Sequence, residues 1–164
     1  MLQEMSTLDL LTLAAALGSG LAAGFFFAFS ICVMQALGKI PASQGVAAMQ
    51  WINVVVFNPW FFSVFFGTAA LCLAIVIVSL SRWQDPRAVY WLVGGGFYVI
   101  GTILVTMVFN VPRNNALAAL SPASPEAAAY WQNYLSIWTR WNHVRTVAAL
   151  LAALLLTCAL LLRS

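Results

Sequence analysis

The sequence predicts an all-α membrane protein: a four-transmembrane-helix bundle with an extra interfacial helix between helices 1 and 2 and an extended N-terminal part of helix 4. Two observations predict this class. Of the 164 residues, 63% are hydrophobic and only 7% are charged, and the charges are separated by long charge-free stretches. Soluble domains carry about a quarter charged residues, so this composition excludes a water-facing surface. The length allows a single domain, residues 1–164.

The charge-free stretches predict where the chain crosses the bilayer, because a spanning helix needs about 20 apolar residues. Polar residues and prolines interrupt residues 42–58, so we expect this segment to be a helix that lies at the interface or folds back. The four spans are expected at residues 10–37, 60–80, 90–110 and 143–162.

Four crossings place both ends of the chain and the turn at 81–89 on one side. With Arg140 and Arg145 set aside as partly buried, that side holds Arg82, Arg87 and Arg163, against two cations opposite. This narrow margin favours cytoplasmic ends in a multi-pass protein of the bacterial inner membrane. An acidic N-terminus with Glu4 and Asp9 argues against a signal peptide.

Small residues recur at every fourth position of the first span. We expect them to form a smooth stripe against which another helix packs closely. The stripe consists of Ala16, Gly20, Gly24, Ala28, Cys32 and Ala36.

The fourth helix is expected to begin at Ser124-Pro125-Glu126, which combines an N-cap, a first-turn proline and an acidic first turn. Nothing breaks it before Leu162. A continuous helix of this length would measure about 57 Å, so either its first half stands beyond the membrane or it bends near Asn142.

A helical wheel divides the first half of this helix into two faces. The aromatic face fits either an interfacial belt or a flat wall for a planar ligand. It carries Trp131, Tyr134, Trp138, Trp141 and Arg145. The opposite face carries Gln132, Ser136, Thr139 and His143.

The third helix presents polar residues at every fourth position, namely Tyr98, Thr102, Thr106, Asn110 and Asn114. Pro112 predicts that this helix ends or kinks before Asn114. Asn110 carries an amide near the hydrocarbon edge and is therefore a candidate functional residue. It can equally serve a structural role by hydrogen bonding to a neighbouring helix.

Several motifs together resemble the anthrone oxygenase-like family of small integral membrane proteins. They are Phe25-Phe26-Phe27-Ala28-Phe29-Ser30, Val33-Met34-Gln35-Ala36-Leu37, Met49-Gln50-Trp51-Ile52-Asn53, Asn110-Val111-Pro112-Arg113-Asn114 and Trp138-Thr139-Arg140-Trp141-Asn142-His143-Val144-Arg145. The resemblance implies a four-helix membrane fold. By analogy, it also implies oxygenation of an anthrone to an anthraquinone without a tightly bound cofactor.

The candidate catalytic residues are His143, Asn142 and Arg145. His143 is the single histidine and could act as a base near neutral pH, although a histidine here could also be interfacial and structural. The arginine and the amides could stabilise negative charge on a ketone oxygen. The candidate substrate-binding residues are Asn53, Asn110, Asn114, Trp138, Trp141 and Gln50.

The sequence also argues against certain chemistry and partners. One histidine cannot supply a bis-His haem pair or a two-histidine iron site, so we expect no metal and no cofactor. Seven scattered cations form no nucleic-acid-binding stripe. We expect a hydrophobic small molecule or a lipid as partner, and a homo-oligomer remains open.

Two functional hypotheses follow. The first is a membrane-embedded, cofactor-independent oxygenase acting on a planar hydrophobic phenolic or anthrone-type substrate. The alternative is a non-catalytic membrane protein that binds lipid or quinone, or a subunit of a larger membrane assembly.

Overall fold

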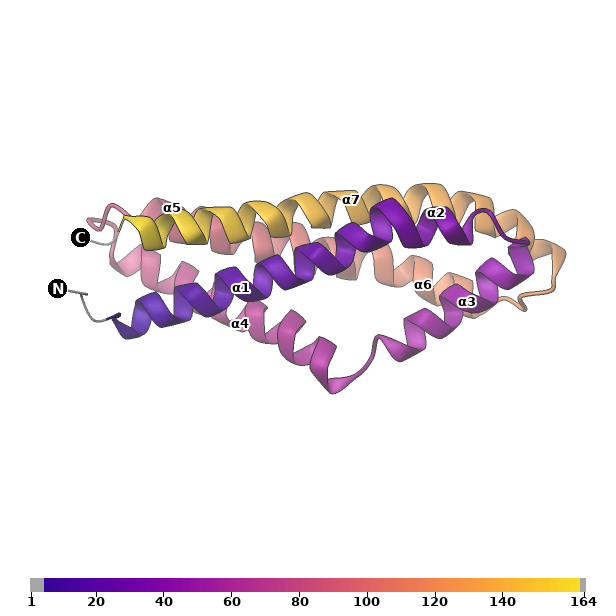
Figure 1. Ribbon diagram of the computed structural model, residues 1–164, viewed down its shortest axis with the longest axis horizontal. Coiled ribbons are helices and arrows are strands. Elements are labelled where there is room, and N and C mark those ends of the chain that lie inside the picture. The colour runs from indigo at the N-terminus through magenta and orange to yellow at the C-terminus, as the bar shows by residue number, and fades with distance from the viewer. Residues whose placement is uncertain (1–4, 163–164) are drawn as a thin grey trace.

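The computed structural model describes residues 5–162, which contain helices and no strands (Figure 1). The first long helix runs without a break through α1, a π-helical stretch η1 and α2. The third does so through α5, the π-helical stretches η2 and η3, and α6. The elements are α1 (Thr7–Ala28), η1 (Phe29–Val33), α2 (Met34–Leu37), α3 (Ala42–Val55), α4 (Pro59–Ser81), α5 (Ala88–Gly96), η2 (Phe97–Leu104), η3 (Thr106–Asn110), α6 (Val111–Ala118) and α7 (Pro125–Leu161).

Four of these helices are long and apolar enough to cross a membrane, which confirms the predicted fold class. They span Thr7–Leu37, Pro59–Ser81, Ala88–Ala118 and Pro125–Leu161. The extra helix between the first and second spans is α3. The last helix begins where its capping signal predicts, because the Ser124 side chain accepts a hydrogen bond from the backbone N–H of Ala127.

The bundle has two unequal halves. The two ends of the chain lie at the same end of the molecule, and α7 runs its whole length (Figure 1). At the other end the chain turns into α3, which folds back beside α7 and α6 and meets α4 at an outward-pointing joint. Gln50 of α3 secures this return by donating hydrogen bonds to the carbonyls of Leu117 and Leu120, both at 2.9 Å.

The membrane boundary follows from helix lengths. With 23 residues, α4 measures about 35 Å, enough to cross a hydrocarbon core about 30 Å thick. With 37 residues, α7 measures about 56 Å and does not break near Asn142. We therefore expect the first half of α7 to stand beyond the hydrocarbon together with α2, α3 and α6, with the α3–α4 joint at the boundary.

The small-residue stripe predicted along the first helix does not form the packing face. Gly20 and Gly24 are exposed and have open space beside them. The helix repeats every 3.6 residues, so a stripe with a period of four rotates steadily around the axis and leaves the contact face. Close approach to α4 occurs instead at Gly18, where a Cβ atom would collide with the side chain of Thr68.

Of the end or kink before Asn114 that Pro112 predicts, the end does not occur. A π-helical stretch, η3, directly precedes α6, and Pro112 is the second residue of α6. Pro112 has no N–H to donate within the continuous helix, and local π-helical adjustments of this kind accommodate a proline in a membrane helix. The helix therefore continues to Ala118 and carries Asn114 along the bundle.

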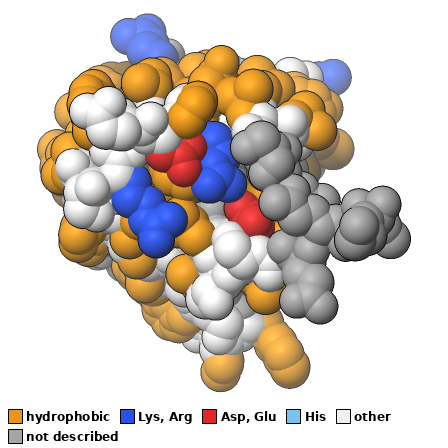
Figure 2. Space-filling model, turned by 90° about the vertical axis from the view of Figure 1, so that its left-hand side faces the viewer, with side chains coloured by type: hydrophobic (Ala, Val, Ile, Leu, Met, Phe, Trp, Pro, Cys, Tyr) orange, Lys and Arg blue, Asp and Glu red, His pale blue; other side chains and the backbone are white. Residues whose placement is uncertain are grey.

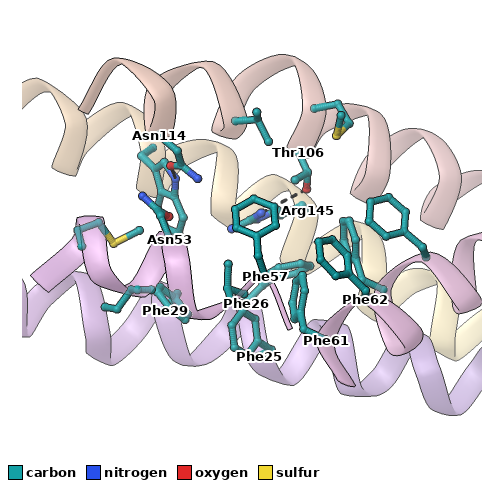
Figure 3. Close-up of a pocket in the computed structure, with 18 residues that line it drawn as sticks. Phe25, Phe26, Phe29, Asn53, Phe57, Phe61, Phe62, Thr106, Asn114 and Arg145 are labelled. Atoms are coloured by element: carbon teal, nitrogen blue, oxygen red, sulfur yellow. Dashed lines mark hydrogen bonds between the residues drawn. The ribbon is translucent and has the colours of Figure 1, made fainter. Parts of the chain in front are cut away.

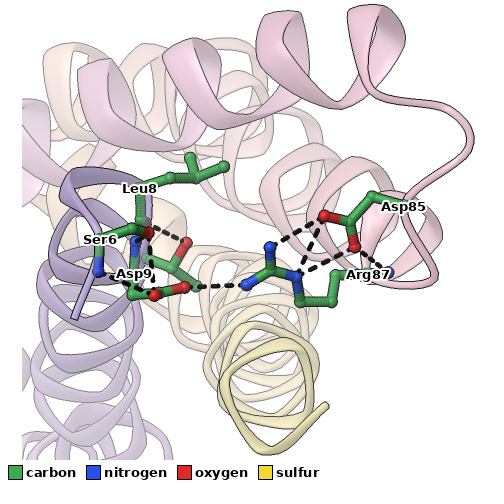
Figure 4. Close-up of polar contacts among 6 residues, drawn as sticks. Ser6, Leu8, Asp9, Asp85 and Arg87 are labelled. Carbon is green, nitrogen blue, oxygen red and sulfur yellow. Dashed lines mark hydrogen bonds and ion pairs between the residues drawn. The ribbon is translucent and has the colours of Figure 1, made fainter. Parts of the chain in front are cut away.

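An ion cluster closes the end of the bundle that holds the chain termini (Figures 2 and 4). The Arg87 guanidinium contacts Asp9 of α1 at 2.9 Å and Asp85 of the α4–α5 turn at 2.8 Å. Asp9 also completes a capping box with Ser6 at the start of α1. Arg87 thereby joins two segments far apart in the sequence. Arg163 lies outside the described residues.

We expect Arg87→Gln to lower the thermal stability of the protein in detergent at pH 7. The hydrogen bond from Arg87 lowers the pKa of Asp85 below its ordinary value of 3.8. A lowered folded-state pKa contributes stability that is present above the unfolded value and is lost as the pH falls through the folded one. The expected loss is about 1 kcal/mol or less for such a partly exposed cluster.

The measurement is the melting temperature of wild type and Arg87→Gln at pH 7 and at pH 3, with the exposed Arg82→Gln as control. The difference should shrink at pH 3. A difference that stayed constant with pH would contradict the role of the carboxylates.

Candidate functional site

The candidate site is built around Arg145, which is only 6% exposed. Its Nε donates to Oδ1 of Asn142 at 2.9 Å, and its Nη1 donates to Oγ1 of Thr106 at 3.2 Å. The guanidinium carbon lies 4.0 Å from the ring centroid of Phe26 and 5.0 Å from that of Trp138. Two side-chain oxygens and two aromatic rings thus surround the Arg145 cation.

No carboxylate pairs with this cation among the described residues, where both ion pairs belong to Arg87. Burying a charge without a counter-ion is costly unless hydrogen bonds and a ligand compensate. The third nitrogen, Nη2, makes no hydrogen bond to the described part of the chain. One edge of the guanidinium is therefore available to an acceptor outside the protein.

Asn142 holds Arg145 by anchoring α7 to the first helix. Fully buried, it donates from Nδ2 to the carbonyl of Phe26 at 2.7 Å and to Oγ of Ser30 at 2.6 Å. Ser30 lies in the π-helical stretch η1. The Phe26 carbonyl just before this stretch also accepts the backbone N–H of Phe29, so Asn142 supplies a second donor to it.

Thr106 holds the other edge of the guanidinium from the third helix. Its hydroxyl donates to the carbonyl of Thr102 at 2.7 Å, which leaves the oxygen lone pairs free to accept from Arg145. Thr102 in turn donates to the backbone carbonyl of Arg145 at 3.5 Å. Thr102 lies in η2 and Thr106 in η3, so both π-helical stretches of the third helix contact Arg145.

Beside the guanidinium lies a pocket, which we call the Arg145 pocket, with a cavity volume of about 100 Å³, part of it open to the outside (Figure 3). Eight phenylalanines line it: Phe25, Phe26, Phe29, Phe57, Phe61, Phe62, Phe65 and Phe66. The other lining residues include Met49, Asn53, Thr106, Asn114, Trp138 and Arg145.

The far end of the Arg145 pocket is marked by two amides, Asn53 and Asn114 (Figure 3). Oδ1 of Asn114 accepts from the hydroxyl of Tyr134 and from Nε1 of Trp138, both at 2.8 Å. An indole N–H can only donate, so the oxygen of Asn114 must face Trp138. Its Nδ2 makes no hydrogen bond to the described residues and remains available to a ligand.

The structure brings together six of the predicted site residues. Arg145 and Asn142 form the cation site, and Asn53, Asn114 and Trp138 line the pocket. Asn110, fully buried, supports the pocket from behind by donating to the carbonyl of Trp138 at 3.2 Å.

Three predicted site residues lie elsewhere. His143 is exposed and is not among the residues that line the Arg145 pocket. The expected proximity of its ring to the site is wrong, because two residues along a helix turn the side chain by about 200°. Trp141 stacks on Phe109, with centroids 3.5 Å apart. Gln50 donates hydrogen bonds to the carbonyls of Leu117 and Leu120.

The phenylalanine lining and the role of Thr106 were missed by the sequence reasoning. A threonine in a membrane helix commonly bonds its own backbone, and Thr106 does so while also accepting from Arg145. The signal that could have found it is the periodicity that placed Thr102 and Thr106 on one face.

Among the described residues, no group of three or more His, Cys, Asp or Glu side chains could hold a metal ion. The arrangement is suited to a flat apolar molecule that carries a negative or partly negative oxygen. The aromatic rings would contact its faces, and the free edge of Arg145 would bind the oxygen.

These features define a multi-pass helical membrane protein with a cationic, aromatic-lined pocket at the membrane boundary. A family model described as anthrone oxygenase matches residues 60–155, and the chain belongs to this family. The match includes Thr106, Asn114, Asn142 and Arg145 but not the residues contributed by α1 and α3.

One curated relative is similar over part of the chain. The chain is 27% identical over 104 residues to cytochrome c-type biogenesis protein NrfE of Haemophilus influenzae, covering 60% of this chain and 16% of that protein. The chain thus spans only a small part of this relative. No solved structure matches.

We expect Asn142→Ala to destabilise the folded protein, because it removes the buried acceptor of Arg145 Nε and the side-chain donor to the Phe26 carbonyl and to Ser30. The expected loss is about 2–3 kcal/mol, measured as thermal unfolding in detergent. Gln132→Ala, an exposed change on the same helix, is the control. Equal melting temperatures for the two variants would contradict the anchoring role of Asn142.

Proposed function

We propose that this protein is a membrane oxygenase that binds a planar, hydrophobic phenol or anthrone in the Arg145 pocket and oxidises it with O₂. The observation that carries the proposal is a buried guanidinium that faces an aromatic-lined cavity without a carboxylate partner among the described residues. Membership of the anthrone oxygenase family supports the same substrate class.

The chemistry of an anthrone suits such a site. Its CH₂ group lies between two aryl rings, opposite a ketone. Loss of one proton gives a delocalised anion with negative charge on the ketone oxygen, and this anion can reduce O₂. A C–O bond then forms at the former CH₂ carbon. The resulting peroxide loses water to leave a second carbonyl, so O₂ supplies one oxygen to the product and one to water.

Arg145 would act on the substrate anion. Its free Nη2 edge binds the ketone oxygen and stabilises the negative charge, which lowers the pKa of the CH₂ group. Such stabilisation is strong where water is excluded and the donors are already in place, as Asn142 and Thr106 place them here. Neither histidine nor a carboxylate lines the pocket, so the proton passes to water.

A second oxygen on the substrate would meet the amide end of the Arg145 pocket. Nδ2 of Asn114 offers a donor, and a phenolic hydroxyl or a carbonyl can accept from it. Trp138 and the phenylalanines would hold the ring system between these two polar ends. This orientation would place the reacting carbon inside the pocket.

We expect Arg145→Gln to lower the turnover of anthrone in detergent or nanodiscs by about 100-fold or more, the scale found when one oxyanion donor is removed. The measurement is anthraquinone formation with matched O₂ consumption. Thr106→Val, which keeps the shape of the side chain, should cause a smaller decrease in the same direction.

The control for these variants is Arg140→Gln, because Arg140 is exposed on the same helix. Melting temperatures would show that each variant is folded. Unchanged turnover in a folded Arg145→Gln variant would contradict the proposal.

We expect His143→Ala to retain turnover within about twofold, with an unchanged pH profile, because an exposed side chain outside the pocket cannot reach the reacting carbon. The measurement is the initial rate from pH 5 to pH 9. Loss of a titration step near the ordinary pKa of histidine would restore His143 as the base.

A second candidate function is binding of a quinone or lipid without chemistry, alone or as a subunit of a larger membrane assembly. The absence of a carboxylate or histidine from the pocket lining favours it, because Arg145 and Asn114 can bind carbonyl oxygens equally well. Quinone binding without O₂ consumption would select this candidate.

A further inference from the structure

A second cavity adjoins the Arg145 pocket, with a volume of about 380 Å³. The two cavities share five lining residues, so side chains and not a helix separate them. The shared residues are Phe25, Phe29, Ile52, Val56 and Phe61. Three further residues line only the second cavity, namely Trp51, Val55 and Asn58. We call it the joint cavity because it lies at the α3–α4 joint.

The joint cavity is lined mainly by apolar side chains. Its lining carries two polar side-chain groups, the indole N–H of Trp51 and the amide of Asn58, which caps α4. Oδ1 of Asn58 accepts from the N–H of Phe61, and its Nδ2 donates to the carbonyl of Val55, both at 3.0 Å. The cavity carries no charged group and suits a largely apolar occupant.

The surroundings of the joint cavity open toward the membrane boundary. Trp51 is 69% exposed and Trp60 is 85% exposed. Exposed tryptophans at the ends of membrane helices typically lie at the headgroup level. A chain leaving the Arg145 pocket through this cavity thus enters the bilayer without crossing a polar surface.

We infer that the natural ligand carries an alkyl or polyprenyl tail: its oxygenated ring lies in the Arg145 pocket and its tail lies in the joint cavity. This inference rests on the proposed function and narrows its substrate class from planar phenols in general to membrane-resident, tailed phenols, quinols or anthrones. The adjacency of the two cavities, one with a cation at its base and one largely apolar, matches an amphipathic molecule of this kind.

The tail contributes little to affinity when it exchanges between bilayer and cavity, because both surroundings are apolar. A direct test of its position is therefore sharper than a binding constant. The probe is an anthrone with a ten-carbon alkyl chain ending in a photoreactive diazirine, incubated with the protein in nanodiscs, irradiated and analysed by peptide mass spectrometry.

We expect labelling to concentrate on Trp51, Val55 and the neighbouring residues of the joint cavity. Val55→Trp should decrease this labelling at least fivefold, because the larger ring fills the cavity. Val54→Trp is the matched control, since Val54 is adjacent, similarly exposed and lines neither cavity. Excess decylanthrone should compete with the label.

Two results would overturn the inference. Labelling spread over lipid-facing positions such as Leu73 and Ile77 of α4, with no effect of Val55→Trp, would place the tail in bulk lipid. Equal labelling of the joint cavity by a fatty acid diazirine, undiminished by decylanthrone, would assign the cavity to a membrane lipid.

Failure of the tail inference is distinguishable from failure of the proposed function. Turnover of untailed anthrone with its loss in Arg145→Gln would leave the function in place while the labelling refuted the tail. Labelling of the joint cavity with no turnover of either anthrone would support the tailed ligand as a bound molecule and contradict the oxygenase.

Discussion

The burial of one guanidinium group without a carboxylate partner in the described chain is the constraint on which the rest of the site depends. Such a charge is tolerated only where hydrogen-bond acceptors and aromatic faces surround it. Asn142 and Thr106 accept from it, and Phe26 and Trp138 cover it. Three long helices must therefore converge at one level, and the edge left over faces a cavity.

This convergence explains the irregular helices. Both π-helical stretches closest to Arg145, η1 in the first helix and η3 in the third, contribute a partner of the cluster: Ser30 binds Asn142, and Thr106 binds Arg145. A π turn changes the direction of the side chains that follow it. Helices that are otherwise apolar can thus direct polar groups toward one point without being interrupted.

The position of the Arg145 cluster along the bundle also determines how a ligand reaches the pocket. Because α4 begins near the cluster and crosses toward the chain termini, the Arg145 pocket lies at the membrane boundary. A hydrophobic ligand reaches this level by partitioning into the bilayer, while its polar oxygen stays close to water. The ion cluster of Arg87 at the opposite end fixes the helix ends without entering the site.

The sequence by itself determined the helices, because charge-free length and capping residues reflect local energetics: the four spans, α3 and the start at Ser124 all followed from it. The sequence also placed Arg145 and His143 on opposite faces of α7. Their closeness along the chain was therefore no reason to assign both side chains to one site. Only the tertiary structure decided which apolar side chains line the pocket. Phe26 is 1% exposed and lines the pocket, whereas the adjacent Phe27 is 49% exposed and does not. Both are phenylalanines in the same apolar stretch, and in a membrane protein lipid and protein core are equally apolar surroundings for a side chain. Hydrophobicity therefore cannot distinguish the two environments, and contacts between distant helices decide the outcome.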